Sequence, residues 1–299
     1  MSRADRDPDH AQVLRARLTE PRIVVVPGCY DALSASLIQH SGFDAAYLSG
    51  ASIAYTRLGQ PDIGLVSMHE VAQTVSAIRE RVTLPVLVDA DTGFGNALNM
   101  QRTVKLFERA GASALQIEDQ QFPKRCGHLA GKAVVPAEEM IGKIRAACDA
   151  RNDADTVIIA RTDAVAVEGI DAAFERVARY LEAGADVLFM EALPDVPAMQ
   201  RFTREFGERL PLLANMVEGG RTPLLSAAEL QQMGYSIAIF PGAMVRVQTF
   251  AALHYLRTLA RDGTTRALRD EMLDFDELNE LLETRRWLQH GERYAGKRD

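Results

Sequence analysis

Lysine, arginine, cysteine, glycine and histidine follow one another at residues 124–128, and these side chains could carry acid–base or nucleophilic chemistry. Positive charge beside a cysteine favours the thiolate, so we expect Lys124, Arg125 and His128 to lower the pKa of Cys126. Gly127 allows the backbone to bend toward a ligand. We interpret the stretch as a mobile catalytic loop, with Lys124, Cys126 and His128 as catalytic residues and Gly127 as a substrate contact. A solvated basic loop with an incidental cysteine explains the five residues equally well.

Carboxylates precede this loop at the ends of two apolar runs. Asp89 and Asp91 follow residues 85–88 (Pro-Val-Leu-Val), and Glu118 ends the second run. With Asp62 they offer an oxygen-only ligand set, which selects Mg²⁺ or Mn²⁺ over zinc. A divalent cation would also relieve the repulsion among crowded carboxylates. The alternative for the two aspartates is a capped turn into the next helix.

Groups that could bind an anionic substrate lie at three other points of the chain. Residues 49–52 (Ser-Gly-Ala-Ser) form a turn whose N–H groups and hydroxyls could hold a carboxylate or oxyanion. Arg161 and Arg246, each near the end of an apolar run, could bind a carboxylate through two parallel hydrogen bonds. Residues 93–95 (Gly-Phe-Gly) lack the further residues of a nucleotide-binding glycine loop.

Composition limits the class of protein. Hydrophobic residues make up 47% and charged residues 25% of the 299-residue chain, as in a globular enzyme. The net charge of −7 without a large basic face argues against a nucleic-acid partner. The three cysteines (Cys29, Cys126 and Cys148) are widely and irregularly spaced, which predicts neither a disulfide framework nor a zinc site and suits a reducing cytoplasm.

Membrane insertion and export are not expected. The segment from Met1 to His10 is charged and lacks an apolar stretch, and no run of 18 apolar residues occurs in the sequence. We therefore expect no membrane partner.

Short apolar runs typical of buried strands alternate with longer stretches of helical periodicity. The eight expected strands are Ile23–Val26, Ala45–Leu48, Val86–Val88, Ala114–Ile117, Val157–Ala160, Val187–Met190, Leu212–Ala214 and Ile237–Phe240. The helices expected between them are Ala32–His40, His69–Arg81, Ala97–Arg109, Ala137–Ala150, Ile170–Ala183, Val196–Phe206 and Ala227–Met233.

Strands that are apolar along their whole length belong in a parallel sheet covered on both faces, so the α/β pattern predicts a TIM (β/α)8 barrel spanning residues 1–299 as one domain. An open doubly wound sheet is the alternative. The barrel is favoured because polar residues follow nearly every strand, where such barrels build their sites. These residues are Tyr30, Asp31, Ser49, Gly50, Asp89, Asp91, Glu118, Arg161, Asp163, Glu191 and Asn215.

Extra helices are expected after the eighth strand, at Val245–Asp262 and from Thr265 to about Tyr294. The extension from about residue 265 to 299 exceeds what closure of a barrel requires. Its apolar residues, among them Leu278 and Trp287, are expected to pack against the barrel or a second subunit.

Seven motifs together resemble the isocitrate lyase and phosphoenolpyruvate mutase superfamily. The resemblance covers nearly the whole barrel and implies a magnesium-dependent enzyme that acts on 2-oxo or 2-hydroxy acids through an enolate. It also implies a homotetramer in which a C-terminal helix is exchanged between subunits. The motifs are Tyr47–Gly50, Gly59–Asp62, Asp89–Gly95, Ile117–Gln120, Lys124–His128, Ile159–Asp163 and Asn215–Gly220.

The resemblance also implies roles for individual residues. Asp89 and Asp91 match metal positions, with Glu118 and Asp62 acting through waters. Cys126 matches the acid that protonates the carbanion-like half released when a carbon–carbon bond breaks, which favours a lyase. The matching cradle and carboxylate contacts are Ser49, Gly50, Ala51, Arg161 and Asn215, and the candidate bases for the 2-hydroxyl are Tyr47 and Glu191.

The residues Glu218-Gly219-Gly220, with Gly131-Lys132, resemble the branch that holds dimethylmalate lyase, oxaloacetate hydrolase and carboxyvinyl-carboxyphosphonate phosphorylmutase. Methylisocitrate lyases usually carry Glu-Phe-Gly at the former place, and an arginine for a third carboxylate where this chain has Phe275. The expected reaction is therefore lyase cleavage of a 2-alkylmalate-type dicarboxylate to a 2-oxo acid such as pyruvate. Methylisocitrate lyase, hydrolase and mutase activities are alternatives, and a catalytically inactive binding scaffold is a remote one.

Overall fold

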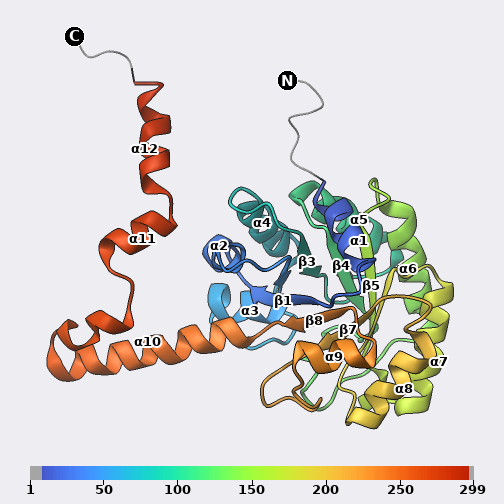
Figure 1. Ribbon diagram of the computed structural model, residues 1–299. Coiled ribbons are helices and arrows are strands. Elements are labelled where there is room, and N and C mark those ends of the chain that lie inside the picture. Colours follow the sequence, from blue (N-terminus) through green and yellow to red (C-terminus); the bar gives the residue numbers. More distant parts are fainter. Residues whose placement is uncertain (1–8, 296–299) are drawn as a thin grey trace. The chain divides into compact units, whose positions relative to one another are not determined.

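Eight parallel strands form a closed barrel in the computed structural model, which describes residues 9–295 (Figure 1). The strands pair in chain order, and β1 closes the barrel by pairing with β8. Their bounds are β1 Val24–Cys29, β2 Ala46–Leu48, β3 Val86–Asp89, β4 Ala114–Glu118, β5 Val157–Thr162, β6 Val187–Met190, β7 Leu212–Asn215 and β8 Ile237–Phe240. The predicted (β/α)8 barrel with extra C-terminal helices is confirmed.

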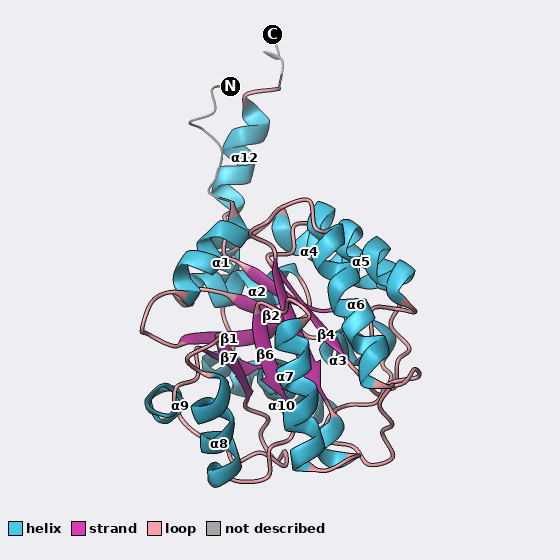
Figure 2. Cartoon of the chain, turned by 90° about the vertical axis from the view of Figure 1, so that its right-hand side faces the viewer, coloured by secondary structure: helices cyan, strands magenta, loops and turns pink. Residues whose placement is uncertain are grey.

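Helices connect the strands and surround the barrel (Figure 2). Those that follow or lead into strands are α2 Ala32–His40, α3 Gly50–Ile53, α4 Met68–Arg79, α5 Ala97–Ala110, α6 Ala137–Ala150, α7 Ile170–Glu182, α8 Val196–Phe206 and α9 Ala227–Met233. Side-chain caps begin several of them: Ser67 and Ser226, for example, each form a capping box with a glutamate three residues on. These local signals explain why most predicted bounds agree with the structure to within two residues.

The core has two layers, as a barrel requires. Alternate strand residues point inward and pack on one another, as Val157 and Ile159 of β5 do. The remaining strand residues face the surrounding helices and form the larger cluster. A helix that the sequence pattern did not predict, α1 (His10–Leu18), places Leu14 in the inner layer. Arg15 of α1 donates to the carbonyl oxygens of Asp155 and Thr156 before β5, so α1 closes the amino-terminal end of the barrel.

Two strands extend further than their apolar runs. β1 continues through Pro27 and Gly28 because residues 24–27 pair with β8. β5 continues through Arg161, whose backbone is in register with Glu118 of β4. Barrel pairing therefore overrides the local change to polar or turn-forming residues, and Arg161 lies inside a strand rather than after one.

The segment expected to form an open anion-binding turn at residues 49–52 begins a helix instead. Ser49 caps α3, and its hydroxyl oxygen accepts a hydrogen bond from the Ser52 N–H at 3.2 Å. A π-helical turn, η2 (Ala54–Leu58), continues the helix. The Ser49 oxygen is thus engaged in capping, while the N–H of Gly50 stays directed at the barrel mouth.

The chain divides into two compact units at Val245 and Arg246, and the second unit holds most of the C-terminal helices. Its elements are α10 (Ala243–Asp262), η4 (Arg266–Glu271), α11 (Phe275–Leu281) and α12 (Thr284–Glu292). The helical region predicted from Thr265 to Tyr294 is broken into three pieces, with Glu283 in the left-handed region at φ 56° before α12. Phe250, Phe275 and Trp287 are exposed on this unit.

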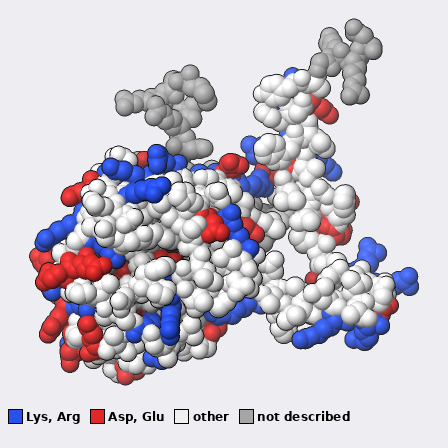
Figure 3. Space-filling model, turned by 180° about the vertical axis from the view of Figure 1, so that it is seen from behind, with Lys and Arg blue, Asp and Glu red and all other residues white. Residues whose placement is uncertain are grey.

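Acidic and basic side chains are interspersed on the face of the barrel seen in Figure 3. Among residues 9–295, no helix has both the length and the apolar composition needed to span a bilayer. Most of the charged Met1–His10 segment lies outside the described residues, as do residues 296–299 of the predicted extension.

Candidate active site

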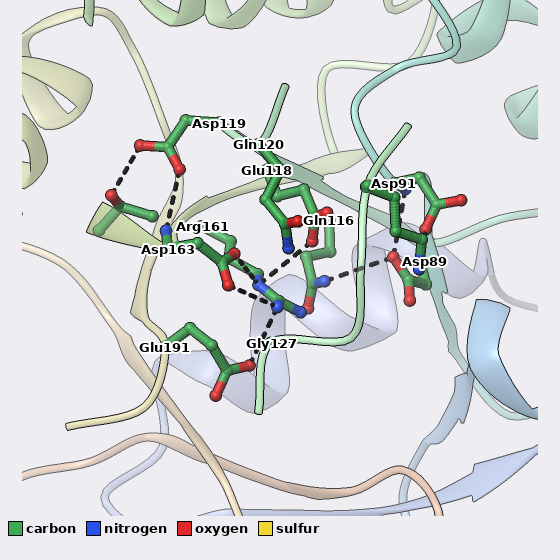
Figure 4. Close-up of polar contacts among 12 residues, drawn as sticks. Asp89, Asp91, Gln116, Glu118, Asp119, Gln120, Gly127, Arg161, Asp163 and Glu191 are labelled. Carbon is green, nitrogen blue, oxygen red and sulfur yellow. Dashed lines mark hydrogen bonds and ion pairs between the residues drawn. The ribbon is translucent and has the colours of Figure 1, made fainter. Parts of the chain in front are cut away.

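Polar side chains at the carboxyl ends of the strands continue the inward-facing alternation of the barrel core. In β4, Ala114, Gln116 and Glu118 share one face, and in β5 Val157 and Ile159 are followed on that face by Arg161. The same period of two brings inward residues from neighbouring strands to one mouth, where Figure 4 shows Asp89, Gln116, Glu118, Arg161 and Glu191. Asn215 joins them by its hydrogen bond to Glu191. All six are buried.

Arg161 is the centre of this cluster. Its guanidinium contacts Asp163 (Nε to Oδ2, 2.8 Å), Glu118 (Nε to Oε2, 3.3 Å) and Glu191 (Nη2 to Oε2, 3.2 Å). Burial alone would lower the pKa of Arg161, but the three carboxylates outweigh it and raise the pKa well above its usual value. Asn215 donates to the same Glu191 Oε2 at 3.0 Å. The predicted carboxylate contacts Arg161 and Asn215 therefore lie together around Glu191.

Asp163 is held from behind by a second buried carboxylate. Asp119 accepts hydrogen bonds from the Asp163 N–H (2.9 Å), the Thr162 hydroxyl (2.6 Å) and the Tyr180 hydroxyl (2.8 Å). Burial would raise the pKa of Asp163, but Arg161 and Lys132 hold it at about 2. Asp163 thus stays ionised and fixes Arg161.

The predicted metal carboxylates lie at the same mouth, with a lysine among them. Lys124 Nζ contacts Asp62 Oδ1 at 2.6 Å and Asp91 Oδ1 at 2.8 Å. Asp89 accepts from the N–H groups of Gly50 (3.3 Å) and Asp91 (3.2 Å). In the part of the chain that the structure describes, no three His, Cys, Asp or Glu side chains are grouped so as to enclose a metal ion.

The oxygens that remain fit a divalent cation. Glu118 Oε1 is buried and accepts no hydrogen bond, whereas Asp91 Oδ1 is held by the Lys124 ammonium at 2.8 Å. Burial raises the pKa of Asp91 to about 7 and that of Glu118 well above its usual value, so negative charge here is under-compensated. Asp91 also adopts a left-handed backbone at φ 46°, a strain found where a carboxylate must be aimed. A set of oxygen donors that includes a buried carboxylate oxygen without a hydrogen bond suits Mg²⁺.

The predicted lowering of the pKa of Cys126 is wrong. Burial, which disfavours the thiolate, raises the pKa of this thiol. The neighbouring cations do not compensate, because Lys124 is paired with two aspartates and Arg125 Nη1 donates to the Ala130 carbonyl oxygen at 3.1 Å. Cys126 is therefore a thiol at neutral pH, as a proton donor must be.

His128 is held as a neutral side chain facing Glu191. Burial lowers the pKa of His128. Its Nδ1 accepts a hydrogen bond from the Arg221 N–H at 3.1 Å, so the neutral ring carries its proton on Nε2, 3.5 Å from Glu191 Oε1. Gly220 leaves room for the His128 ring, since a Cβ at residue 220 would lie 2.9 Å from the imidazole.

Gly127 brings the loop backbone against Arg161. A Cβ at this position would lie 2.5 Å from Arg161 Nη2 and 2.6 Å from Glu191 Cγ, so a larger residue does not fit (Figure 4). The predicted loop residues Lys124, Cys126 and His128 thus lie at the mouth, and each has different neighbours there.

Tyr47 reaches the site from β2. Its hydroxyl donates to Gln116 Oε1 at 3.0 Å, and burial, followed by the charge of Asp89, raises its pKa well above the usual value. Tyr47 therefore keeps its proton. Gln116, which also donates to Asp89 Oδ1 at 3.5 Å, was missed by sequence reasoning, although a glutamine within an apolar strand was a usable signal. Arg246 belongs to the second compact unit and remains a prediction.

A family model described as phosphoenolpyruvate phosphomutase matches residues 14–260. The chain belongs to the phosphoenolpyruvate mutase/isocitrate lyase superfamily. It is 46% identical over 274 residues to 2,3-dimethylmalate lyase of Eubacterium barkeri, covering 91% of this chain and 93% of that protein. Identity to 2-methylisocitrate lyase of Aeropyrum pernix is also 46%, over 90% of this chain and 86% of the relative.

Solved structures agree. A crystal structure of 2,3-dimethylmalate lyase matches with a TM-score of 0.91 at 36% identity, covering 97% of this chain and 96% of that one. Phosphonopyruvate hydrolase, solved with oxalate and Mg²⁺, matches with a TM-score of 0.85 at 31% identity, covering 95% and 99%. Superfamily members thus bind Mg²⁺, and the present chain is a lyase of this superfamily.

The burial of Cys126 predicts how its reactivity depends on pH. The rate of alkylation by iodoacetamide follows the thiolate fraction. Because the pKa is raised, we expect the half-maximal rate for Cys126 to lie above pH 9.0, the usual value. Mass spectrometry of the Cys126 peptide, with urea-unfolded protein as the reference, measures it. A midpoint below that of the unfolded chain would show that the neighbouring cations dominate after all.

Proposed function

We propose that the protein is a Mg²⁺-dependent lyase that cleaves a 2-alkylmalate-type dicarboxylate to a 2-oxo acid, such as pyruvate, and a carboxylic acid. The observation that carries this proposal is a protonated thiol, Cys126, on a loop whose next residue packs on Arg161 and Glu191. A thiol that keeps its proton beside a carboxylate-binding arginine suits protonation of a carbanion-like leaving half. The 46% identity to 2,3-dimethylmalate lyase supports the same reading.

The side chains divide into a carboxylate site, a base and an acid. Arg161 and Asn215 bind the carboxylate of the half that becomes the 2-oxo acid, while the Tyr47 hydroxyl donates a hydrogen bond to the substrate. Glu191 takes the proton of the 2-hydroxyl, since Tyr47 keeps its own. The carbon–carbon bond then breaks, its electron pair passes to the departing half, and Cys126 donates the proton that completes the carboxylic acid. His128 faces Glu191 at 3.5 Å, while Arg161 and Asn215 hold this carboxylate in place.

Asp89 and Asp91, supported by Glu118 and Asp62, would hold the cation. When bound, Mg²⁺ would supply positive charge that stabilises the negative charge developing on the substrate oxygens. The buried Glu118 Oε1, which accepts no hydrogen bond, supports this assignment. Mn²⁺ would suit the same donors.

Methylisocitrate cleavage is the second candidate, because a 2-methylisocitrate lyase is as similar in sequence as the dimethylmalate enzyme. Its substrate carries a third carboxylate, which costs several kcal/mol to bury without a cation. The resemblance implies that Phe275 stands where methylisocitrate lyases carry an arginine for that group, which favours the alkylated substrate. Carboxyvinyl-carboxyphosphonate phosphorylmutase activity has no equal use for a thiol acid.

We propose a homotetramer in the reducing cytoplasm. The exposed Phe250, Phe275 and Trp287 of the second unit support exchange of the C-terminal helices between subunits, since large apolar side chains in water favour association. The three cysteines are free thiols, which supports the compartment.

Activity should require Mg²⁺ or Mn²⁺. Exhaustive chelation should lower turnover by on the order of a hundredfold or more, because several kcal/mol of charge stabilisation is lost. Asp91→Asn should have the same effect with the fold retained, whereas Asp44→Asn, a carboxylate at the opposite end of the barrel, should leave turnover unchanged. Full turnover in chelator would refute a metal-dependent reaction, and a matching loss of thermal stability in Asp91→Asn would make that residue structural.

Cys126→Ser should lower kcat by on the order of a hundredfold or more, as loss of a general acid does, with a smaller change in KM. Cys148→Ser serves as the control, because Cys148 lies on α6 away from the mouth. Steady-state kinetics on 2,3-dimethylmalate measure both. If Cys126→Ser retains most of its turnover, the thiol is incidental and a hydrolase or mutase becomes the better assignment.

2,3-Dimethylmalate should be a better substrate than 2-methylisocitrate. The preference in kcat/KM could reach roughly a hundredfold, because about 1.4 kcal/mol of desolvation cost corresponds to each tenfold step. A coupled pyruvate assay at identical Mg²⁺ compares the two. Faster cleavage of methylisocitrate would show that another cation, such as Arg246, receives the third carboxylate and that the branch assignment is wrong.

A further inference from the structure

Lys132 joins the loop that carries Cys126 to the carboxylate that fixes the substrate arginine. Its ammonium donates to the Gly127 carbonyl oxygen and contacts Asp163 Oδ1 at 2.7 Å. The same Asp163 oxygen accepts from Arg161 Nη2 at 3.2 Å. One carboxylate therefore holds both the arginine and, through Lys132, the backbone next to the thiol.

The Lys132 side chain is buried together with its ion-pair partner. Its side chain is 2% exposed and that of Asp163 is fully buried, so the ion pair is shielded from water and from screening by salt. The two acceptors lie on different parts of the chain, five residues and 31 residues away. A buried ammonium that spans them is a tie between loop and barrel rather than a surface ion pair.

Other contacts hold the beginning of the loop and His128, whose Nδ1 accepts from the Arg221 N–H at 3.1 Å. The Gln120 side chain accepts from the Arg125 N–H at 2.9 Å and donates to its carbonyl oxygen at 2.8 Å. Beyond Cys126, residues 129–131 are exposed, and the Arg125 side chain only bonds the loop to itself through Ala130. Backbone hydrogen bonds from Gln121 to Ala133 and from Val135 to Asp119 follow the exposed stretch, and Lys132 adds the tie to Asp163.

We propose that Lys132 is a positioning residue: by tying the Gly127 carbonyl to Asp163, it holds Cys126 over a substrate bound by Arg161. The role rests on the proposed lyase function, but the tie itself does not. Without the ammonium, the loop loses two hydrogen bonds from a charged donor while Arg161 keeps Asp163, Glu118 and Glu191. The thiol should then spend more time away from the site, and the carboxylate contacts should persist.

The test compares Lys132→Met, Lys132→Arg and, as a control in the same loop, Arg125→Met. Lys132→Met keeps the length of the buried stem without the charge, Lys132→Arg restores a donor, and Arg125→Met removes a bond within the loop. Three quantities are measured: the rate of Cys126 alkylation by iodoacetamide at a fixed pH, resolved by peptide mass spectrometry; kcat and KM for 2,3-dimethylmalate; and the melting temperature.

In Lys132→Met we expect alkylation of Cys126 to rise about tenfold or more and kcat to fall by a similar factor, with KM changed less than threefold. Lys132→Arg should recover part of both, and Arg125→Met should resemble wild type. The proposal is overturned if Lys132→Met alkylates at the wild-type rate, or if KM and the melting temperature change while the kcat effect is absent. If wild-type protein cleaves no 2-hydroxy dicarboxylate, the lyase proposal fails, and the alkylation rates still decide whether Lys132 ties the loop.

Discussion

The site depends on the compensation of buried charge around one guanidinium. Arg161 lies within 3.3 Å of three carboxylates, of Glu118, Asp163 and Glu191, and all four side chains are shielded from water. Losing one partner of such a buried pair typically costs about 3–5 kcal/mol, because the remaining charge stays buried. Each charge at the mouth is thus constrained by its neighbours, and the positions of the loop, the acids and the amide follow from that constraint.

The barrel supplies the geometry that makes this possible. Parallel pairing sets Glu118 and Arg161 in register, and Phe189 of the next strand places its ring 5.2 Å below the guanidinium. The same inward alternation that packs Val157 and Ile159 in the core carries Arg161 to the mouth. A polar residue one position earlier or later would face the outer helices, so the site requires the strand to continue past its apolar run.

Much of this could be predicted from the sequence, and the failures have physical causes. Eight apolar runs and their capping residues define the barrel, because strand and helix periodicity are local. The charge state of Cys126 depends on residues that are distant in sequence. Lys124 forms ion pairs with Asp62 and Asp91, which lie far from the loop in sequence, so burial decides the pKa of the thiol. α1 was missed because its role is to place Leu14 in the barrel interior, a tertiary contact that its short, weakly amphipathic sequence does not indicate.

The environments of the titratable groups separate acid from base. Burial keeps the proton on Cys126 and on Tyr47, and it keeps His128 neutral, so these side chains are donors or neutral neighbours at physiological pH. The positive charges of Arg161 and Lys132 instead keep Asp163 ionised. Glu191 touches Arg161, Asn215 and His128 at once. In the proposed reaction Glu191 accepts the substrate proton, while the groups around it supply charge and hydrogen bonds.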